Sequence, residues 1–315
     1  MIVTITLNPA LLVDYAVSKV VPGATNPVRR VGYRIGGRGL AVARVLNTFG
    51  HDVVAAGLAG GSAGELIRNE LARAGVPTQF TRIAAESRRV VTATDDADGR
   101  VTSFDEPAPY ITTEELGRLA SDYRSLLTGA TAVVLCGSLP DGLPPEIYGS
   151  FASYAAEAGV PVILDAGGSA LAHGAARQPA LVVPELRADQ ELDLMAGPRP
   201  GEGAGSIALL TGHEVRVLTP EGEWRAGLGP AATRLVPGGP DEPDEPPGRL
   251  DDAFRDALVA GFVPGIALAW SWPDILRHAV ALGKAWSPGG ELDVEVYEDT
   301  LTAVNVSQLR QRHKV

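Results

Sequence analysis

Cysteine is almost absent from this sequence: there is one, Cys136, among 315 residues. A single cysteine cannot form an internal disulfide, and it excludes zinc sites built from several cysteines. It ends an apolar run that begins at residue 132, so we expect a buried thiol on a strand, in a protein from a reducing compartment. The five histidines stand singly, at 51, 173, 213, 278 and 313. We therefore expect them on the surface or in loops, with no metal-ligand cluster.

Long hydrophobic runs and clustered positive charge are also missing. The longest apolar run beyond the N-terminus, about 266–270, is too short to cross a bilayer, and residues 1–7 are typical of a strand rather than a signal peptide. Asp and Glu number 38 against 27 Lys and Arg, for a net charge of −11. That balance argues against a nucleic-acid surface. We expect a cytoplasmic protein with neither a membrane nor a nucleic acid as partner.

Strand-like and helix-like segments alternate along most of the chain. Strands are predicted at 2–7, 53–58, 132–136, 160–164 and 181–183, and helices at about 65–74, 113–127, 145–158 and 169–177. Repeated strand-then-helix units predict a parallel sheet. Further β-like runs follow at 207–210, 215–218 and 224–226, then helices at 251–262 and 272–285 and a basic, solvated tail at 310–314. At 315 residues the chain could form one large α/β domain or two smaller ones, and 45% hydrophobic residues are enough for a substantial core. The chain shows no internal repeats and no second domain, so we expect one domain spanning 1–315.

A helix start after the Pro-rich loop 237–247 carries a candidate catalytic carboxylate. Phe254, Leu258 and Phe262 recur at helical spacing, so either Asp251 or Asp252 is placed to cap the helix. Backbone N–H groups at a helix start attract anions, and a carboxylate there could deprotonate a hydroxyl that attacks a phosphate. The plain alternative is that both aspartates only cap the helix.

A glycine-rich turn, residues 36–39, opens another predicted helix. Glycines let the backbone approach a ligand closely, the helix start favours an anion, and Arg38 could add a planar fork for phosphate. The turn is also compatible with an ordinary loop-to-helix junction. Neither this turn nor the one at 60–64 has the spacing of a dinucleotide-binding motif.

Motifs in order along the chain resemble the PfkB (ribokinase-like) carbohydrate kinases, within them the 1-phosphofructokinase and tagatose-6-phosphate kinase branch. They are TLNPA at 6–10, VPGxxN at 21–26, GGRGLxVARVL at 36–46, ESR at 86–88, EPxP at 106–109, GSLPxG at 137–142, LD at 164–165 and DAF at 252–254. The resemblance covers residues 2 to about 285. A nucleoside substrate is disfavoured, because such relatives do not need the phosphate-binding GG[KR]G and E[TS]R residues.

This resemblance implies an α/β fold: a doubly wound, mostly parallel sheet with helices on both faces and a small β lid, from about 12–35 and 88–104. It implies ATP and Mg²⁺ as cofactors, a small phosphorylated sugar of the fructose 1-phosphate or tagatose 6-phosphate class as substrate, and a homodimer through the lid. Asp252 would be the catalytic base. The implied substrate-binding residues are Asn8, Asp14, Gly37, Arg38, Gly39, Arg88 and Ser138.

The chain departs from the family pattern mainly on the nucleotide side. GAGD is replaced by Arg249, Leu250, Asp251 and Asp252, and KPNxxE by residues 183–188, with Glu185 in place of the asparagine. We assign the nucleotide or anion region to Arg249, Leu250, Asp251 and Glu185. Two like charges 4 Å apart repel by roughly 4 kcal/mol at an effective dielectric of ~20, so Asp251 would disfavour a phosphate there.

On the sugar side, Leu12, Ala41 and Val90 replace an Asp and two Asn residues. Two hypotheses therefore stand: a working ATP-dependent kinase of a phosphorylated sugar, or a catalytically impaired pseudokinase that acts as a sugar-phosphate-binding or regulatory protein.

Overall fold

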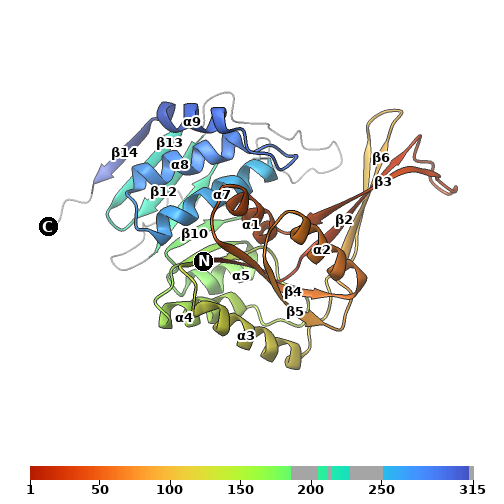
Figure 1. Ribbon diagram of the computed structural model, residues 1–315, viewed down its shortest axis with the longest axis horizontal. Coiled ribbons are helices and arrows are strands. Elements are labelled where there is room, and N and C mark those ends of the chain that lie inside the picture. The colour runs from red at the N-terminus through yellow and green to blue at the C-terminus, as the bar shows by residue number, and fades with distance from the viewer. Residues whose placement is uncertain (186–204, 212–213, 228–250, 312–315) are drawn as a thin grey trace.

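The computed structural model describes residues 1–185, 205–211, 214–227 and 251–311. A ten-stranded sheet forms its centre, with strand order β14-β13-β12-β11-β10-β9-β8-β1-β4-β5 (Figure 1). The strands from β11 to β5 are mutually parallel, and β12, β13 and β14 continue the sheet as an antiparallel meander. Their bounds are β1 Ile2–Thr6, β4 Val53–Gly60, β5 Thr78–Ile83, β8 Ala132–Cys136, β9 Val162–Ala166, β10 Leu181–Pro184, β11 Ser206–Leu210, β12 Glu214–Thr219, β13 Gly222–Gly227 and β14 Val306–Gln311.

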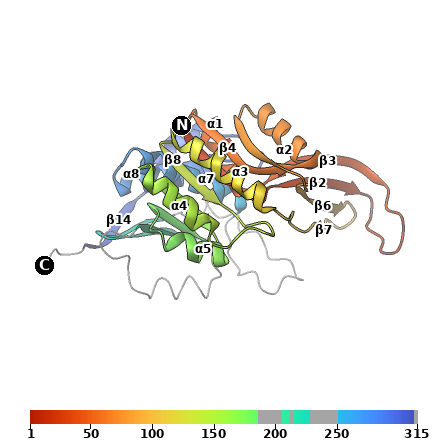
Figure 2. The ribbon, with the colours of Figure 1, turned by 90° about the horizontal axis from the view of Figure 1, so that it is seen from below.

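Helices cover both faces of this sheet because successive strand residues point to opposite sides. On β8, Ala132, Val134 and Cys136 join one hydrophobic core, while Val133 and Leu135 join the other. The first core is shared with α1 (Arg38–Thr48), α2 (Gly61–Arg73), α7 (Asp252–Ala267) and α8 (Trp272–Ala285), the last of which also packs against α9 (Val294–Ala303). The second is shared with α3 (Thr113–Leu127), α4 (Ile147–Glu157) and α5 (Gly168–Ala175) (Figure 2).

A second, four-stranded sheet projects from the main body, and we call it the lid (Figure 1). Its order is β3-β2-β6-β7, with β2 at Ala10–Val17, β3 at Val28–Gly36, β6 at Arg88–Asp95 and β7 at Val101–Asp105. The predicted doubly wound fold with a small β lid is thereby confirmed, whereas the assignment of the whole chain to one domain stays a prediction. Among the described residues, no helix is both long and apolar enough to span a membrane.

Two expectations near the C-terminus need correction or restriction. The solvated tail was expected at 310–314, but Arg310 belongs to β14, which pairs with β13 at the edge of the large sheet, and residues 312–314 lie outside the described part of the chain. His278 was expected at the surface, but its side chain is buried on α8. It follows Ile275 by three residues and precedes Leu282 by four, so it lies on the apolar face of the helix.

Candidate functional site

Several predicted site residues lie at one edge of the large sheet, where the parallel strands β1, β8, β9 and β10 end. Asn8 follows β1 and Ser138 follows β8, and the Asn8 side-chain amide donates a 3.2 Å hydrogen bond to the Ser138 hydroxyl. Tyr148, from α4, fixes the turn before Ser138, because its hydroxyl donates to the carbonyls of Cys136 (2.8 Å) and Gly137 (3.1 Å). The carboxyl edge of a doubly wound sheet is the usual place for a ligand site.

The glycine-rich turn brings α1 close to β1. Gly37 has φ +130°, which a residue with a side chain rarely adopts, and an added Cβ there would lie 2.9 Å from Thr6 Cγ2. A Cβ on Gly39 would collide with Thr6 Oγ1 and lie 3.1 Å from the Ile5 carbonyl. Packing of the helix against the strand therefore already requires both glycines, and their contact with a ligand stays a prediction.

The lid carries two more of the predicted substrate-binding residues. Asp14 on β2 accepts hydrogen bonds from Arg34 on β3 at 2.7 and 3.0 Å, and this bonding lowers the pKa of Asp14. Arg88, the first residue of β6, is paired with Asp105 on β7. Asp14 and Arg88 lie on the same face of the lid, because Arg88 is in register with Ala10 and side chains alternate along a strand.

Glu86 and Ser87, from the ESR motif, anchor the base of β6 to α2. The Glu86 carboxylate accepts hydrogen bonds from the backbone N–H groups of Ser62 and Ala63 and from the Ser62 hydroxyl. These bonds at a helix N-terminus lower the pKa of Glu86. The Ser87 hydroxyl accepts a hydrogen bond from the Gly60 N–H at 3.0 Å. The motif therefore fixes the backbone that precedes Arg88.

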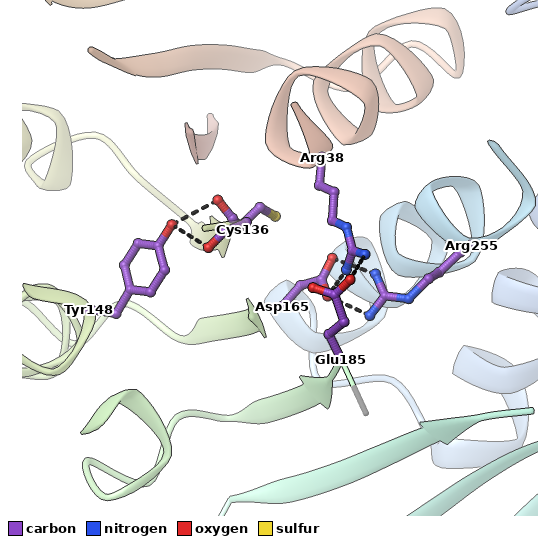
Figure 3. Close-up of polar contacts among 7 residues, drawn as sticks. Arg38, Cys136, Tyr148, Asp165, Glu185 and Arg255 are labelled. Carbon is purple, nitrogen blue, oxygen red and sulfur yellow. Dashed lines mark hydrogen bonds and ion pairs between the residues drawn. The ribbon is translucent and has the colours of Figure 1, made fainter. Parts of the chain in front are cut away.

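Four charged side chains converge beside the ends of β9 and β10 (Figure 3). Arg255 donates two hydrogen bonds to Asp165, from Nη1 to Oδ2 at 2.9 Å and from Nη2 to Oδ1 at 2.6 Å. Arg38 donates to Oδ1 of Asp165 at 3.3 Å and to Oε1 of Glu185 at 2.6 Å. Asp165 is completely buried, and Arg255 is nearly so. We call Arg38, Asp165, Glu185 and Arg255 the charge cluster.

Asp256, the residue after Arg255, is a third acidic group at this place, beside Asp165 and Glu185, and its side chain is buried. Burial raises its pKa well above the ordinary value, and the negative charges of Asp165 and Asp252 act in the same direction. The guanidinium groups of Arg38 and Arg255 oppose the rise only in part. The carboxyl group of Asp256 is therefore neutral under conditions in which an exposed aspartate is ionised.

The two candidate aspartates at the start of α7 have different roles. Asp251 is the N-cap, and its Oδ1 accepts hydrogen bonds from the N–H groups of Ala253 (2.7 Å) and Phe254 (3.4 Å). Asp252 is the first residue of the helix and its side chain is exposed. Residues three and four apart on a helix are neighbours, so Asp252 lies next to Arg255 and Asp256. Two other predicted residues, Arg249 and Leu250, lie outside the described part of the chain.

Sequence reasoning missed Arg255 and Asp256, and it did not place Asp165 in the site. The signal was present: an Arg-Asp pair interrupts the otherwise apolar face of α7, between Phe254 and Leu258. Charged residues are almost never fully buried unless they are paired, so such a pair on a buried helix predicts partners elsewhere in the fold.

The donor set does not fit a protein-bound metal ion. Within the described residues, no group of three or more His, Cys, Asp and Glu side chains is arranged to hold one. Both oxygens of Asp165 and one oxygen of Glu185 already accept hydrogen bonds from guanidinium groups. No chemical step is therefore assigned to a metal ion held by these side chains.

A cavity of about 620 Å³ lies between the antiparallel meander and the helices α8 and α9. Its lining includes Arg225, Lys284, Thr300 and Asn305. Lys284 follows Gly283, which packs against the Phe254 ring so closely that an added Cβ would lie 3.2 Å away. The cavity therefore lies at the end of α8 that packs against the first turn of α7.

Comparisons with known proteins identify the family and the fold of this chain. The model of the pfkB family carbohydrate kinases matches residues 5–217, which is more than half of the chain. The fold is similar to that of a candidate phosphofructokinase from Staphylococcus aureus (22% identity, TM-score 0.77, covering 99% of this chain and 100% of that one). It is also similar to a candidate 1-phosphofructokinase from Thermotoga maritima (20%, 0.77, 98% and 100%) and to phosphofructokinase-2 from Escherichia coli in complex with fructose-6-phosphate (21%, 0.73, 96% and 98%). At these identities the structures show a common fold, and the family model confirms the resemblance found in the motifs. The chain belongs to the pfkB family of carbohydrate kinases.

Proposed function

We propose that this protein transfers the γ-phosphoryl group of ATP to a hydroxyl of a phosphorylated sugar. The observation that carries the proposal is the position of Asp252. It begins α7 at the edge of the sheet where Asn8, Ser138 and Arg38 also lie. There the Asp252 carboxylate would take the proton of the sugar hydroxyl. The hydroxyl oxygen of the sugar would then bond to the γ-phosphorus of ATP as ADP leaves.

For the sugar phosphate we propose Arg38 and Arg88 as the phosphate-binding pair. Gly36, Ala10 and Arg88 are in register across three neighbouring lid strands, so the backbones at Gly36 and Arg88 are about 10 Å apart. Within the described part of the chain, Arg88 Nε and Asn8 Oδ1 are buried atoms without a hydrogen-bond partner. A ligand with phosphate and hydroxyl groups would satisfy both. The structural neighbour named as a 1-phosphofructokinase supports the fructose 1-phosphate member of the proposed fructose 1-phosphate or tagatose 6-phosphate class.

For the nucleotide we propose the cavity beside α7, with the phosphates directed toward Asp252. Its lining offers Lys284 and Arg225 as cations and Thr300 and Asn305 as hydrogen-bonding groups. The buried, reduced Cys136 is compatible with the cytoplasm, where ATP and phosphosugars are available. Thr300→Trp, which would fill the cavity, should weaken ATP binding and leave phosphosugar binding intact.

The proposed function is tested by calorimetric titration with ATP and Mg²⁺, followed by turnover assays on a panel of phosphosugars. Asp252→Asn should bind both ligands and lose at least 100-fold in kcat, because the general base is removed. Glu114→Gln, which changes an exposed carboxylate in the first turn of α3, is the matched control and should retain wild-type turnover. Ligand binding without turnover on any sugar would instead support the sugar-phosphate-binding, regulatory alternative.

We also propose that the lid forms a homodimer contact. Tyr33, Val13, Val91 and Phe104 make one row across β3, β2, β6 and β7. The two outer members are exposed, Tyr33 by 54% and Phe104 by 63%. Val13 is buried in the first hydrophobic core and Val91 packs against that core, so the row offers a second copy of the chain its two exposed aromatic edges, Tyr33 and Phe104. Such edges fit a twofold contact, in which like pairs with like.

A further inference from the structure

The charge cluster contains a pair of carboxylates in a place suited to a divalent cation. Asp165 lies in β9 and Glu185 follows β10, and the two strands are neighbours in the parallel part of the sheet. The Glu185 N–H also donates to the Ala166 carbonyl at 2.9 Å, so the backbones that carry the two side chains are held together. Carboxylate oxygens at adjacent strand ends are the hard ligands that Mg²⁺ and Mn²⁺ prefer.

In this chain, arginines take those oxygens. Arg255 reaches Asp165 from α7 with a two-pronged hydrogen bond, and Arg38 reaches both Asp165 and Glu185 from α1. Figure 3 shows the two guanidinium groups entering from different helices and meeting at the same carboxylate. Arg255 has little freedom to leave, since its side chain is only 10% exposed and Asp165 is not exposed at all.

The charges of the cluster are balanced without any ion. Two guanidinium groups face two carboxylates, and burial raises the pKa of the neighbouring Asp256. A divalent cation at Asp165 would have to displace Arg255 and leave it buried without its partner. The cost of separating this buried pair weakens the binding of a divalent cation on the order of 100- to 1,000-fold.

We infer that Arg255 and Arg38 act as resident cations, closing the Asp165 and Glu185 carboxylates to a divalent metal ion. This inference does not depend on the proposed phosphoryl transfer, because it concerns the protein without any nucleotide. Arg255 is a positioning residue in this arrangement: it holds Asp165 and fixes the carboxylate that Arg38 contacts. Any divalent cation used in a reaction would then have to arrive with the phosphates of the nucleotide.

The test is a titration of the full chain with Mn²⁺ alone, followed by electron paramagnetic resonance of the free ion. Wild type and Glu185→Gln are expected to give the same isotherm, because Glu185 is not available as a ligand. Arg255→Met is expected to gain one site, with at least tenfold tighter binding than any site of wild type. The double variant Arg255→Met with Asp165→Asn is expected to lose that site again.

Arg118→Met is the matched control, because it removes a positive charge from the surface pair with Glu114 and should gain no site. The inference is overturned if wild type binds Mn²⁺ and Glu185→Gln weakens that binding tenfold or more. It is also overturned if Arg255→Met shows native circular dichroism but gains no site. If Arg255→Met does not fold, the comparison of wild type with Glu185→Gln, which changes a half-exposed side chain, still decides the question.

Discussion

Asp165 is fully buried, and two guanidinium groups from different helices reach its carboxylate. Isolated burial of a carboxylate costs several kcal/mol, so Asp165 is tolerable only together with Arg255 and Arg38. Arg255 and Arg38 offset the burial of Asp256 only in part, so the pKa of Asp256 rises. The three residues Arg255, Asp256 and Asp165 therefore depend on one another, and none can be understood from its own position in the sequence.

Asp256→Asn should stabilise the protein at neutral pH. Burial raises the pKa of Asp256 in the folded state, so the folded protein keeps a proton that the unfolded chain releases above its ordinary pKa of 3.8. The contribution of Asp256 to wild-type stability therefore falls as pH rises above about 4, and asparagine removes this loss while keeping the shape of the side chain. We expect a higher Tm for the variant at pH 8 and no difference at pH 4.

Differential scanning calorimetry across this pH range measures the effect. Glu157→Gln is the control, because Glu157 is an exposed carboxylate at the end of α4. Its Tm should equal that of wild type at both pH 4 and pH 8. A difference between Asp256→Asn and wild type that stays constant from pH 4 to pH 8 would show that the titration of Asp256 is not its cause.

At the scale of the elements, the start of α7 is fixed by Asp251, and the same side chain affects the anion site. Its carboxylate occupies the N–H groups of Ala253 and Phe254 and brings a negative charge next to Asp252. Asp251→Ser should retain the cap, since serine is as good a capping residue, and should bind ATP several-fold more tightly, because a like charge is removed. Asp251→Ala should lose about 1 kcal/mol of stability.

Thr112→Ala separates the two effects, because Thr112 caps α3 by accepting from the Glu115 N–H at 3.3 Å, and no residue of α3 lines the cavity or belongs to the charge cluster. It should lose a similar stability without any change in ATP affinity. Urea unfolding and calorimetric titration measure the two quantities. If Asp251→Ser binds ATP no better than wild type, the charge of Asp251 does not oppose the nucleotide.

The packing of α8 against α9 should be sensitive to acid through His278. The Nδ1 atom of its ring shares a 2.7 Å hydrogen bond with the Tyr297 hydroxyl, and the ring makes edge contacts with Phe49 and Trp270. Burial lowers the pKa of His278 from 6.5 to about 4. The contribution of His278 to stability should therefore fall by about 3 kcal/mol in total as pH drops through 6.5 toward 4. The reason is that the unfolded chain binds a proton that the folded protein does not bind.

Urea unfolding of wild type and His278→Gln at pH 7.5 and pH 5 tests this. The variant should be less stable at pH 7.5, because the aromatic contacts are weakened, but should lose less stability between the two values than wild type. His173→Gln is the control, since His173 is half exposed, and it should keep the wild-type pH dependence. Equal acid sensitivity of wild type and His278→Gln would assign the effect to other groups.

At the scale of the whole molecule, most of the order of strands and helices was predictable because each signal is local, whereas β5, α9 and β14 were not predicted. The run at 132–136 is uniformly apolar, as a strand with both faces covered must be, and strand-helix alternation then implies parallel pairing. β14 was missed because it is an edge strand with one partner only, and no feature of the residues Val306–Gln311 indicates that β13 lies beside it. Such pairing is a property of the assembled sheet.

The candidate site was predictable where its residues follow strands that pair in the parallel sheet. Asn8 and Ser138 are 130 residues apart, but they follow the paired strands β1 and β8, and the structure brings them together. Arg38 was expected to face a phosphate, yet its partners here are Asp165 and Glu185. These contacts are made by side chains from helices, so they depend on which helices meet over the sheet. The sequence could show that Arg255 was unusual but could not say what it binds.

The lid offers the last prediction, because it is the part of the described structure that projects from the main body (Figure 1). If two copies meet through the row that contains Tyr33 and Phe104, replacing both with serine removes two exposed aromatic anchors and should convert a dimer to a monomer, with at least a 100-fold rise in the dissociation constant. Light scattering coupled to size-exclusion chromatography, over a range of concentrations, measures this. Leu268→Ser is the matched control, because Leu268 is 66% exposed but ends α7 outside the lid. A wild-type chain that is monomeric at the highest concentration would exclude self-association. A dimer that Leu268→Ser disrupts and the lid variant does not would place the contact outside the lid.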